Sequence, residues 1–355
     1  VLTGLLSLAP AAQPATAGVS STRIEGATRA QTSVALARQL VGGNLRQLTH
    51  IIVTSDSGVV DPSVSAGLAA FLDSCAPAGS CRTAVFVTPS GSLDPATAAA
   101  ITESGVAASN VIIVGGAAAI SPEVQTAIAR SAGWNGTGEV PTRRIAGANR
   151  FETSAAVAEF ISDSGEAQPD SFKTVVVVNG DRPADVLLAS TLAAGLGHAL
   201  ILTSSGQLPS NTRAAIESLA PNRMIIVGGD VSVPPSLEAA IRALLPAGAS
   251  SERLGGADRF ETSALIASRV AGSEIKSVVI VSGISLEGAV TVGMLTRLGA
   301  PVLFTGPTAL PPAVANWLSA HRLSGANLIT VGNESSVPSG VIDSARHLID
   351  RPRSG

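Results

Sequence analysis

Aromatic and basic residues are scarce in this 355-residue chain: tyrosine is absent, aromatic residues make up 3% of the sequence, and no run of lysine or arginine occurs. With a formal net charge of −3, the chain lacks the basic surface that attracts nucleic acid or anionic membranes. It also lacks the aromatic platforms on which bases stack. Nucleic acid is therefore not an expected partner.

Charged residues are also few, at 14%, whereas hydrophobic residues reach 45%. This balance supplies material for large cores and argues against disorder. One uncharged stretch, residues 186–203, has roughly the length that a membrane span needs. Gly195, Gly197 and His198 interrupt it. Because Arg297 lies in the corresponding part of a later repeat, a buried helix followed by a buried strand is the better interpretation, and no membrane span is expected.

Catalytic signatures are missing: the sequence contains no Gly-x-Ser-x-Gly elbow, no His-Glu-x-x-His helix and no P-loop. Only two cysteines occur, Cys75 and Cys81, and turn-forming residues separate them. In an exported chain this spacing predicts one disulfide between them, which leaves no cysteine nucleophile. The four histidines are too scattered to complete a zinc site with two thiols, so no metal or other cofactor is expected.

The first 18 residues have the order of segments of a secretory signal peptide without its basic start. An apolar stretch over residues 1–9 is followed by Ala-Thr-Ala at residues 15–17, which has the small-x-small form that signal peptidase accepts. A flexible leader rich in alanine and proline is the alternative. The signal interpretation predicts a secreted protein, and residues 1–18 are excluded from the fold as a partial signal peptide.

One phrase occurs three times. It reads Arg-Ile-Glu-Gly-Ala-Thr-Arg-Ala-Gln-Thr-Ser from Arg23, Arg-Ile-Ala-Gly-Ala-Asn-Arg-Phe-Glu-Thr-Ser from Arg144, and Arg-Leu-Gly-Gly-Ala-Asp-Arg-Phe-Glu-Thr-Ser from Arg253. Copies so far apart mark whole domains rather than turns of a solenoid. The predicted division is repeat 1 (19–143), repeat 2 (144–252), repeat 3 (253–349) and a tail (350–355).

Each repeat alternates short apolar strands with helices. Repeat 2 shows this plan most clearly, with predicted strands at residues 174–178, 199–203 and 224–227 and helices between them. Strands that are almost wholly apolar and alternate with helices indicate a parallel sheet covered on both faces. The linkers between repeats are short. The predicted fold class is therefore α/β, with three tandem small domains, each a mostly parallel sheet covered by helices on both faces, packed together.

The repeated phrase also predicts a helix start. In every copy a short polar residue is followed three positions later by Glu or Gln, the capping-box pattern that satisfies backbone N–H groups at a helix N-terminus. The predicted structural caps are Thr28 with Gln31, Asn149 with Glu152, and Asp258 with Glu261.

The two arginines of each phrase are the candidate ligand-binding residues, because a guanidinium group is a planar fork that suits a carboxylate or a phosphate. The candidates are Arg144, Arg150, Arg253 and Arg259. The alternative is that these arginines pair within the protein. Acids in the loops after the first strand of each repeat are possible partners, and they could equally serve at helix N-termini. These acids are Asp61, Asp181, Asp185 and Glu287.

Gly-Gly pairs follow the third predicted strand of repeats 1 and 2, at residues 115–116 and 228–229. Phosphates bind at this position in nucleotide-binding folds. The full Gly-x-Gly-x-x-Gly is absent, however, and a tight turn with positive φ explains the glycines without a ligand. Nucleotide binding is therefore not the favoured interpretation.

In their fixed order, these phrases resemble the second family of cell-wall-binding repeats of Gram-positive surface proteins. The resemblance rests on the opening phrase, a valine-rich strand, Asn-Gly-Asp-x-Pro-x-Asp from Asn179, Leu-Ile-Leu-Thr from Leu200, and Ile-Ile-Val-Gly-Gly-x-x-x-Val from Ile225. It covers residues 23–348, nearly all of the chain after the signal-like segment.

The resemblance implies a pseudo-threefold unit of α/β domains that holds a surface protein non-covalently to the cell wall. The implied ligand is an anionic wall polymer, such as a teichoic-acid-like or secondary wall polysaccharide. The resemblance also implies that an aliphatic strand phrase contributes to polymer binding. That phrase maps to Leu200, Ile201, Leu202, Pro301, Val302, Leu303 and Phe304. Repeat 1 departs most from the pattern, since it lacks the Phe-Glu of the opening phrase.

The expected function is thus attachment of a secreted, non-enzymatic module to the bacterial cell wall and cell surface. Two alternatives stay open. One is a wall-modifying, amidase-like hydrolase built from loop carboxylates such as Asp181 and Asp185, although the sequence offers no nucleophile beside them. The other is an exported receptor for a small ligand.

Overall fold

The structure is a computed structural model that describes residues 19–74, 82–163, 173–321, 323 and 325–350. Within these residues, twelve strands form three four-stranded sheets, and all the strand pairs in them are parallel. Helices flank each sheet, so the predicted α/β class is confirmed. The predicted signal peptide (1–18) and the predicted disulfide partners Cys75 and Cys81 lie outside the described residues.

Each sheet has the same spatial order, and the strand that follows the first helix of a repeat is one of the two inner strands of its sheet. The first sheet contains β3 (Thr83–Thr88), β2 (His50–Ser55), β4 (Val111–Val114) and β5 (Arg143–Ile145). The second contains β7 (Ala199–Thr203), β6 (Thr174–Asn179), β8 (Arg223–Val227) and β9 (Ser250–Leu254). The third contains β11 (Val302–Thr305), β10 (Ser277–Ser282), β12 (Asn327–Val331) and β1 (Ser20–Ile24).

Helices connect the strands in every repeat. Repeat 1 contains α1 (Arg29–Leu40), α2 (Val60–Ser74), α3 (Pro95–Ser104) and α4 (Pro122–Ser131), with short 3₁₀ turns η1 (Leu45–Gln47) and η2 (Ala108–Asn110). Repeat 2 contains α5 (Arg150–Asp163), α6 (Pro183–Leu196), α7 (Ser210–Leu219) and α8 (Pro235–Arg242). Repeat 3 contains α9 (Arg259–Val270), η4 (Glu287–Ala289), α10 (Gly293–Thr296), α11 (Pro312–Ala320) and α12 (Ser339–Asp350).

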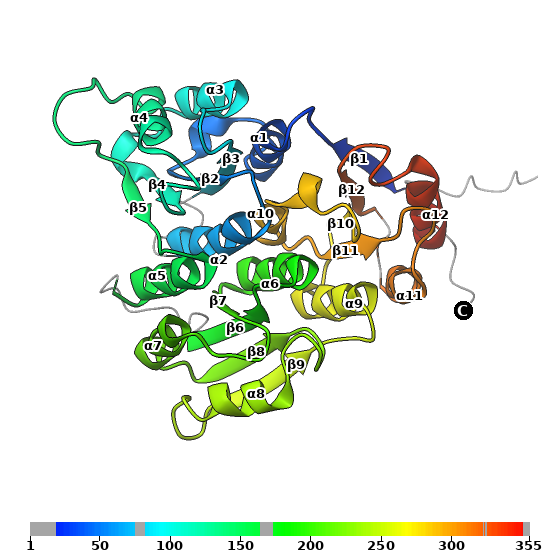
Figure 1. Ribbon diagram of the computed structural model, residues 1–355. Helices are drawn as coiled ribbons and strands as arrows, with labels where there is room; N and C mark the ends of the chain where they lie inside the picture. Colours follow the sequence, from blue (N-terminus) through cyan, green and yellow to red (C-terminus); the bar gives the residue numbers. More distant parts are fainter. Residues whose placement is uncertain (1–18, 75–81, 164–172, 322, 324, 351–355) are drawn as a thin grey trace, which may run out of the picture.

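The strand that opens each repeat belongs to the sheet of the preceding repeat. Strand β5 of repeat 2 pairs with β4 of repeat 1, and β9 of repeat 3 pairs with β8 of repeat 2. Strand β1, at the start of repeat 1, pairs with β12 near the end of the chain, from Ser20 opposite Asn327 to Ile24 opposite Val331. Figure 1 shows these two ends of the chain side by side. The three repeats therefore form a closed ring, in which the β1–β12 pairing joins repeat 3 to repeat 1 without a covalent link.

The centre of the ring is formed by helices α2, α6 and α10, one from each repeat, with the sheets around them (Figure 1). A methyl group added to Gly293 would lie 3.0 Å from Ala66 Cβ and 3.5 Å from the backbone oxygen of Ser190. These three residues come from three different repeats, so the glycine permits the close approach of the central helices.

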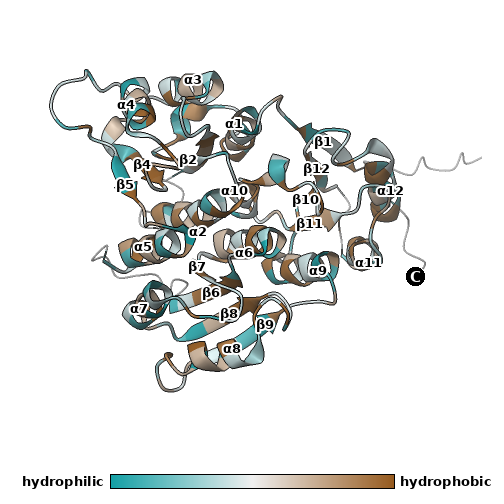
Figure 2. Ribbon diagram, in the orientation of Figure 1, coloured by the Kyte–Doolittle hydropathy of each residue, from teal (hydrophilic) through white to brown (hydrophobic). Residues whose placement is uncertain are grey.

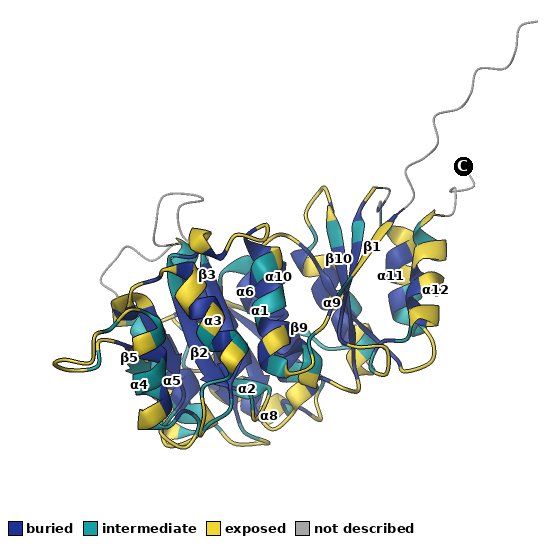
Figure 3. Ribbon diagram, turned by 90° about the horizontal axis from the view of Figure 1, so that it is seen from above, coloured by how far each residue is buried: buried dark blue, intermediate teal, exposed yellow. Residues whose placement is uncertain are grey.

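Apolar side chains fill both the sheets and the contacts between repeats. Figure 2 shows hydrophobic residues along inner strands such as β2 and β10, and Figure 3 shows these strands as buried, whereas the edge strands β1, β5 and β9 are largely exposed or half-buried. A single hydrophobic cluster includes residues from all three repeats, so the repeats share one core rather than behaving as separate beads. Within the described part of the chain, no helix is both long enough and apolar enough to cross a membrane.

A buried ion pair joins repeat 3 to repeat 1. Arg297 follows α10 and pairs with Asp73 in the last turn of α2; their side chains are 6% and 18% exposed. Arg297 also donates a hydrogen bond from Nη1 to the backbone oxygen of Thr83, at 2.7 Å. Burial lowers the pKa of Arg297 to about 10. The arginine nevertheless remains charged at neutral pH. The stability of the folded protein therefore depends on Asp73, which balances this buried charge.

Candidate functional site

The first arginine of each phrase holds the loop that follows the last strand of the preceding repeat. Arg144 donates to the backbone oxygens of Gly115 (2.7 Å) and Ile120 (2.9 Å). Arg253 donates in the same way to Gly228 (2.8 Å) and Val233 (2.9 Å). Burial lowers the pKa of Arg144. Arg144 and Arg253, which the sequence offers as polymer-binding residues, therefore form hydrogen bonds within the protein.

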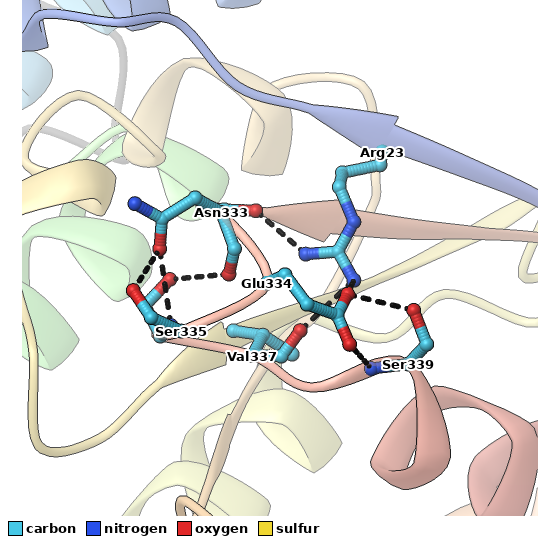
Figure 4. Close-up of polar contacts among 8 residues, drawn as sticks. Arg23, Asn333, Glu334, Ser335, Val337 and Ser339 are labelled. Atoms are coloured by element: carbon cyan, nitrogen blue, oxygen red, sulfur yellow. Dashed lines mark hydrogen bonds and ion pairs between the residues drawn. The ribbon is translucent and has the colours of Figure 1, made fainter.

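Figure 4 shows the third copy of this arrangement, where the ring closes. Arg23 donates to the backbone oxygens of Gly332 (2.8 Å) and Val337 (2.9 Å) and pairs with Glu334 at 3.0 Å. Glu334 in turn accepts a hydrogen bond from the backbone N–H of Ser339, at 2.7 Å. Because Arg23 repeats the contacts of the other two copies, the first arginine has a structural task at every junction.

The centre of the phrase is a helix cap folded over a glycine. Asn149 Oδ1 accepts hydrogen bonds from the backbone N–H groups of Phe151 and Glu152, both at 3.0 Å. Glu152 reaches back to the N–H of Ala148 at 2.9 Å, one residue before the cap. A methyl group at Gly147 would lie 2.6 Å from the backbone carbon of Glu152, so glycine is required there.

The other two copies have the same cap geometry. Thr28 Oγ1 accepts from the N–H of Gln31 at 3.1 Å, and Gln31 Oε1 accepts from the N–H of Ala27 at 2.8 Å. Asp258 Oδ1 accepts from the N–H of Glu261 at 2.8 Å. Glu261 Oε2 also accepts from the backbone N–H one residue before its cap, at 2.8 Å. The caps place the second arginine of each phrase in the first turn of its helix.

The second arginine of each phrase lies at the junction between two repeats. Each one donates to a backbone oxygen just after an inner strand of its own repeat, namely β2, β6 or β10. The three arginines differ in their acidic partners. Arg29 bonds to the backbone oxygen of Asp56 and forms an ion pair with Glu287 of repeat 3, at 2.8 Å. The junction between repeats 3 and 1 therefore already holds a paired arginine.

Arg150 and Arg259 are less engaged. Arg150 donates to Gly180 at 3.0 Å and lies 4.0 Å from a carboxylate oxygen of Asp181. Arg259 donates to Gly283 at 2.7 Å, and no carboxylate oxygen of the described residues lies within 4.0 Å of its guanidinium nitrogens. Arg150 and Arg259 each form one hydrogen bond to a backbone oxygen, and Arg259 differs in having no carboxylate of the described residues within 4.0 Å.

Clefts lie at two of these junctions, at the carboxyl ends of the strands. The 2–3 cleft, between repeats 2 and 3, has a volume of about 620 Å³ and includes Asp185, Ser232 and Arg259 in its lining. The 1–2 cleft, between repeats 1 and 2, has a volume of about 290 Å³ and includes Asp61 and Arg150. Ligands of open parallel α/β sheets bind at this edge, so the clefts are the candidate functional sites.

Each cleft contains a half-buried acid at the start of a central helix. Asp185 lies beside Gly228, a residue with a positive φ of 109°, and accepts a hydrogen bond from Ser232 Oγ at 2.7 Å. Asp61 lies beside Gly115, with φ of 120°. Burial raises the pKa of both Asp185 and Asp61 above the usual aspartate range. Gly115 and Gly228 therefore form tight turns beside the two acids, with the positive φ that the Gly-Gly pairs predict.

Asp61 makes stability depend on pH. Burial raises its pKa in the folded state above the ordinary value of 3.8, so the folded protein binds this proton more tightly than the unfolded chain does. Stability is consequently lost as pH rises from the unfolded pKa through the folded pKa. Asp61→Asn is expected to be as stable as the wild type in acid and more stable at neutral pH.

Urea unfolding followed by circular dichroism, from acid to neutral pH, tests this prediction. Asp343→Asn is the matched control, because the side chain of Asp343 is 72% exposed in α12. The predicted result is a wild-type curve that falls below the Asp61→Asn curve as pH rises. Curves that stay parallel over the whole range would show that Asp61 does not titrate in this way.

The aliphatic strand phrase lies inside the sheets. Six of its side chains are at most 2% exposed, and Pro301 is also buried. The residues are Leu200, Ile201, Leu202, Pro301, Val302, Leu303 and Phe304. They have no surface to offer a polymer in this structure, so any part they play in binding comes from supporting the strand ends that form the clefts.

Sequence reasoning missed Ser232, the hydrogen-bond partner of Asp185. Aligning the three repeats on the third strand would have shown it, because Ala119 and Ser336 occupy the same place beside Gly115 and Gly332. The described residues hold no group of three or more His, Cys, Asp or Glu side chains that could bind a metal ion. The polar side chains that line the two clefts include aspartate, serine and arginine.

Known proteins resemble this chain in sequence and in fold. A family model described as Cell wall binding domain 2 (CWB2) matches residues 23–125, 144–238 and 253–342. The chain is 25% identical over 199 residues to the N-acetylmuramoyl-L-alanine amidase LytC of Bacillus subtilis, a match covering 56% of this chain and 38% of the amidase. It is 28% identical over 170 residues to the Amidase enhancer of the same organism, covering 48% of this chain and 22% of that protein.

Two solved structures share the fold. Cwp8 from Clostridium difficile superposes with a TM-score of 0.74 at 22% identity, covering 94% of this chain and 52% of Cwp8. Cwp6 from the same organism superposes with a TM-score of 0.77 at 20% identity, covering 94% of this chain and 48% of Cwp6. The chain thus spans about half the length of these structures and less than half of the two Bacillus relatives.

Proposed function

The chain belongs to the Cell wall binding domain 2 family, and from this premise we propose that it is an exported, non-catalytic module that attaches to the cell wall by binding an anionic wall polymer. The observation that carries the proposal is the combination of the three family matches with a cleft between repeats 2 and 3. Arg259 enters this cleft with unused donors. A guanidinium group with free N–H donors is suited to a phosphate or a carboxylate.

The ring explains why three repeats are needed for one module. Each sheet takes its edge strand from the next repeat, so an isolated repeat would lack one strand of its sheet. The clefts are likewise built by two repeats together, since Asp185 belongs to repeat 2 and Arg259 to repeat 3. Binding therefore depends on the closed ring.

A second candidate function is a wall-modifying hydrolase, and Asp185 is the observation that favours it. Its raised pKa is a property that general acids share, and it lies in the larger cleft. Ser232, however, donates a hydrogen bond to Asp185, and among the described residues that line the cleft there is no histidine or lysine to act as its base. Release of soluble fragments from purified peptidoglycan by the chain would support this candidate over the first.

Direct binding to a purified teichoic-acid-like polymer tests the proposed function. Isothermal titration calorimetry of the chain is expected to show binding at low ionic strength and weaker binding at physiological ionic strength, because salt screens exposed charges. A neutral polysaccharide of similar length is the control and should not bind. Absence of affinity for anionic polymer at low salt would overturn the proposal.

A further inference from the structure

We propose that the 2–3 cleft is the single ligand site among the three junctions, and that its ligand is an acidic glycosyl unit: a sugar that carries a phosphate or a carboxylate beside free hydroxyl groups. This inference rests on the proposed function and narrows it to one cleft and one class of polymer unit. It is drawn from the differences between three positions that the pseudo-threefold ring makes equivalent.

The first difference concerns the arginine that would meet the negative charge. Arg29 is bound to Glu287 at 2.8 Å and has a side chain only 27% exposed. Arg150 lies 4.0 Å from Asp181. Arg259 has no such acidic partner among the residues that the structure describes. A ligand anion would thus have to displace a direct ion pair at the 3–1 junction, whereas at the 2–3 junction Arg259 feels only the longer-range attraction of Asp185 across the cleft.

The second difference concerns the acid and the hydroxyl opposite the arginine. The 2–3 cleft combines Asp185 with Ser232 at 2.7 Å. In the 1–2 cleft the acid is kept as Asp61, but Ala119 replaces the serine. At the 3–1 junction Gly288 takes the place of the acid. A Cβ atom added to Gly288 would lie 3.6 Å from the Cα atom of Gly332. Only the 2–3 cleft therefore has the acid, the hydroxyl and the available arginine together.

The third difference is space and shape. At about 620 Å³, the 2–3 cleft has more than twice the volume of the 1–2 cleft, at about 290 Å³, and falls within the range of small-ligand sites. Val231, which is 84% exposed, and Leu286 form apolar parts of its lining. Such flanks suit the C–H face of a sugar ring, because they remove apolar surface from water.

The charges of the 2–3 cleft indicate which polymer unit fits. Besides Asp185, the carboxylates of Asp181, Asp230 and Asp258 line it, against the guanidinium groups of Arg182 and Arg259. A unit with closely spaced phosphates would meet more acids than arginines and would be repelled. A unit with one anion, held by Arg259, and several hydroxyls meets less of this repulsion.

The carboxylate of Asp185 can accept hydrogen bonds from those hydroxyls. An ionised carboxylate has about four acceptor positions, and Ser232 occupies one of them. A sugar ring presents its hydroxyls in a fixed arrangement, so less conformational freedom is lost on binding than with a flexible polyol. The cleft is therefore expected to prefer a glycosyl phosphate or a uronic acid to a polyol phosphate.

The test measures binding of small probes to the full chain by calorimetry and by NMR titration. Glucose 1-phosphate and glucuronic acid represent the phosphate and carboxylate forms of the ligand, and glycerol 3-phosphate represents the polyol. The expected stoichiometry is one, with tighter binding of at least one sugar probe than of glycerol 3-phosphate. A stoichiometry of two or three, or equal binding of all probes, overturns the inference.

Two pairs of variants locate the site. Arg259→Gln is expected to weaken binding of the sugar probe by about tenfold, the loss of one charge-assisted hydrogen bond, whereas Arg150→Gln is expected to change it less than twofold. Asp185→Asn should abolish the preference for the sugar probe over glycerol 3-phosphate, and Asp61→Asn should preserve it. Equal losses from Arg259→Gln and Arg150→Gln would overturn the single-site claim.

The outcomes also separate this inference from the proposed function. A chain that binds anionic polymer but shows no preference among the probes disproves the glycosyl specificity and leaves wall-polymer binding in place. A chain that binds neither polymer nor probe disproves the proposed function itself. Circular dichroism and the melting temperature of each variant establish that a loss of binding does not reflect unfolding.

Discussion

Replacing Asp73 with alanine is expected to destabilise the protein by about 3–5 kcal/mol, the usual cost of leaving one charge of a buried pair without its partner. Arg297 is 6% exposed and would keep only its hydrogen bond to Thr83. Because the pair joins repeat 1 to repeat 3, the change also weakens the junction at which the ring closes. Urea unfolding of the chain measures the loss directly.

Two further variants make this result interpretable. Replacing both partners with apolar residues, Asp73→Leu with Arg297→Met, is expected to restore much of the stability, since no uncompensated charge remains. Glu217→Ala breaks an exposed pair with Arg213 on α7, where the side chains are 48% and 53% exposed, and should cost no more than about 0.5 kcal/mol. If Asp73→Ala were as stable as the wild type, the pair would have no role in holding the ring.

Gly147→Val is expected to destabilise the protein by about 2–4 kcal/mol, combining a steric clash with the loss of a helix cap. A side chain at this position would press on Glu152, whose backbone carbon is 2.6 Å from the place of the new Cβ. It would push Glu152 away from the N–H of Ala148. Thermal unfolding monitored by circular dichroism measures the effect.

A glycine in open space provides the control for this substitution. A methyl group added to Gly91 would meet no described atom within 4 Å, and its φ is not in the left-handed region. Gly91→Ala should therefore change stability only slightly. If Gly147→Val were tolerated equally well, the glycine of the phrase would have no steric function, and its recurrence at Gly26 and Gly256 would be unexplained.

Much of the fold could be predicted from local sequence patterns. Apolar runs such as Val175–Val178 are too short for helices and too apolar for edge strands, so they indicate buried parallel strands. The recurrence of these runs after each phrase predicts three α/β units. The capping residues could also be recognised, because a cap depends on side chains only a few positions apart.

The exchange of edge strands could not be predicted in the same way. Strands such as β5 (Arg143–Ile145) are short and only partly buried, and their sequence fits the edge of either neighbouring sheet. Their position is fixed by long-range bonds, such as the one from the N–H of Gly115 to Ile145 at 3.0 Å. The hydrogen bonds of Arg144 to the loop after β4 depend on the same strand pairing, so they could not be predicted from the sequence either.

Repeat 3 departs from the helix plan of repeat 2 for a local reason. The position of α6 is taken by the 3₁₀ turn η4 and the four-residue α10. Gly288 and Gly293 weaken a helix, and the β-branched residues 290–292 between them lose side-chain freedom in one. Alignment of the repeats could have shown this difference. In the same segment, Gly288 stands where the other two junctions have Asp61 and Asp185, so the 3–1 junction lacks this acid.

Co-sedimentation of the chain with purified cell walls, before and after removal of their anionic polymers by mild acid, tests the central claim most directly. We expect the chain to sediment with intact walls and to stay in solution with stripped walls, and Arg259→Gln to sediment less with intact walls than the wild type does. Equal sedimentation with intact and stripped walls would contradict the account, because the chain would then bind peptidoglycan itself rather than an anionic polymer.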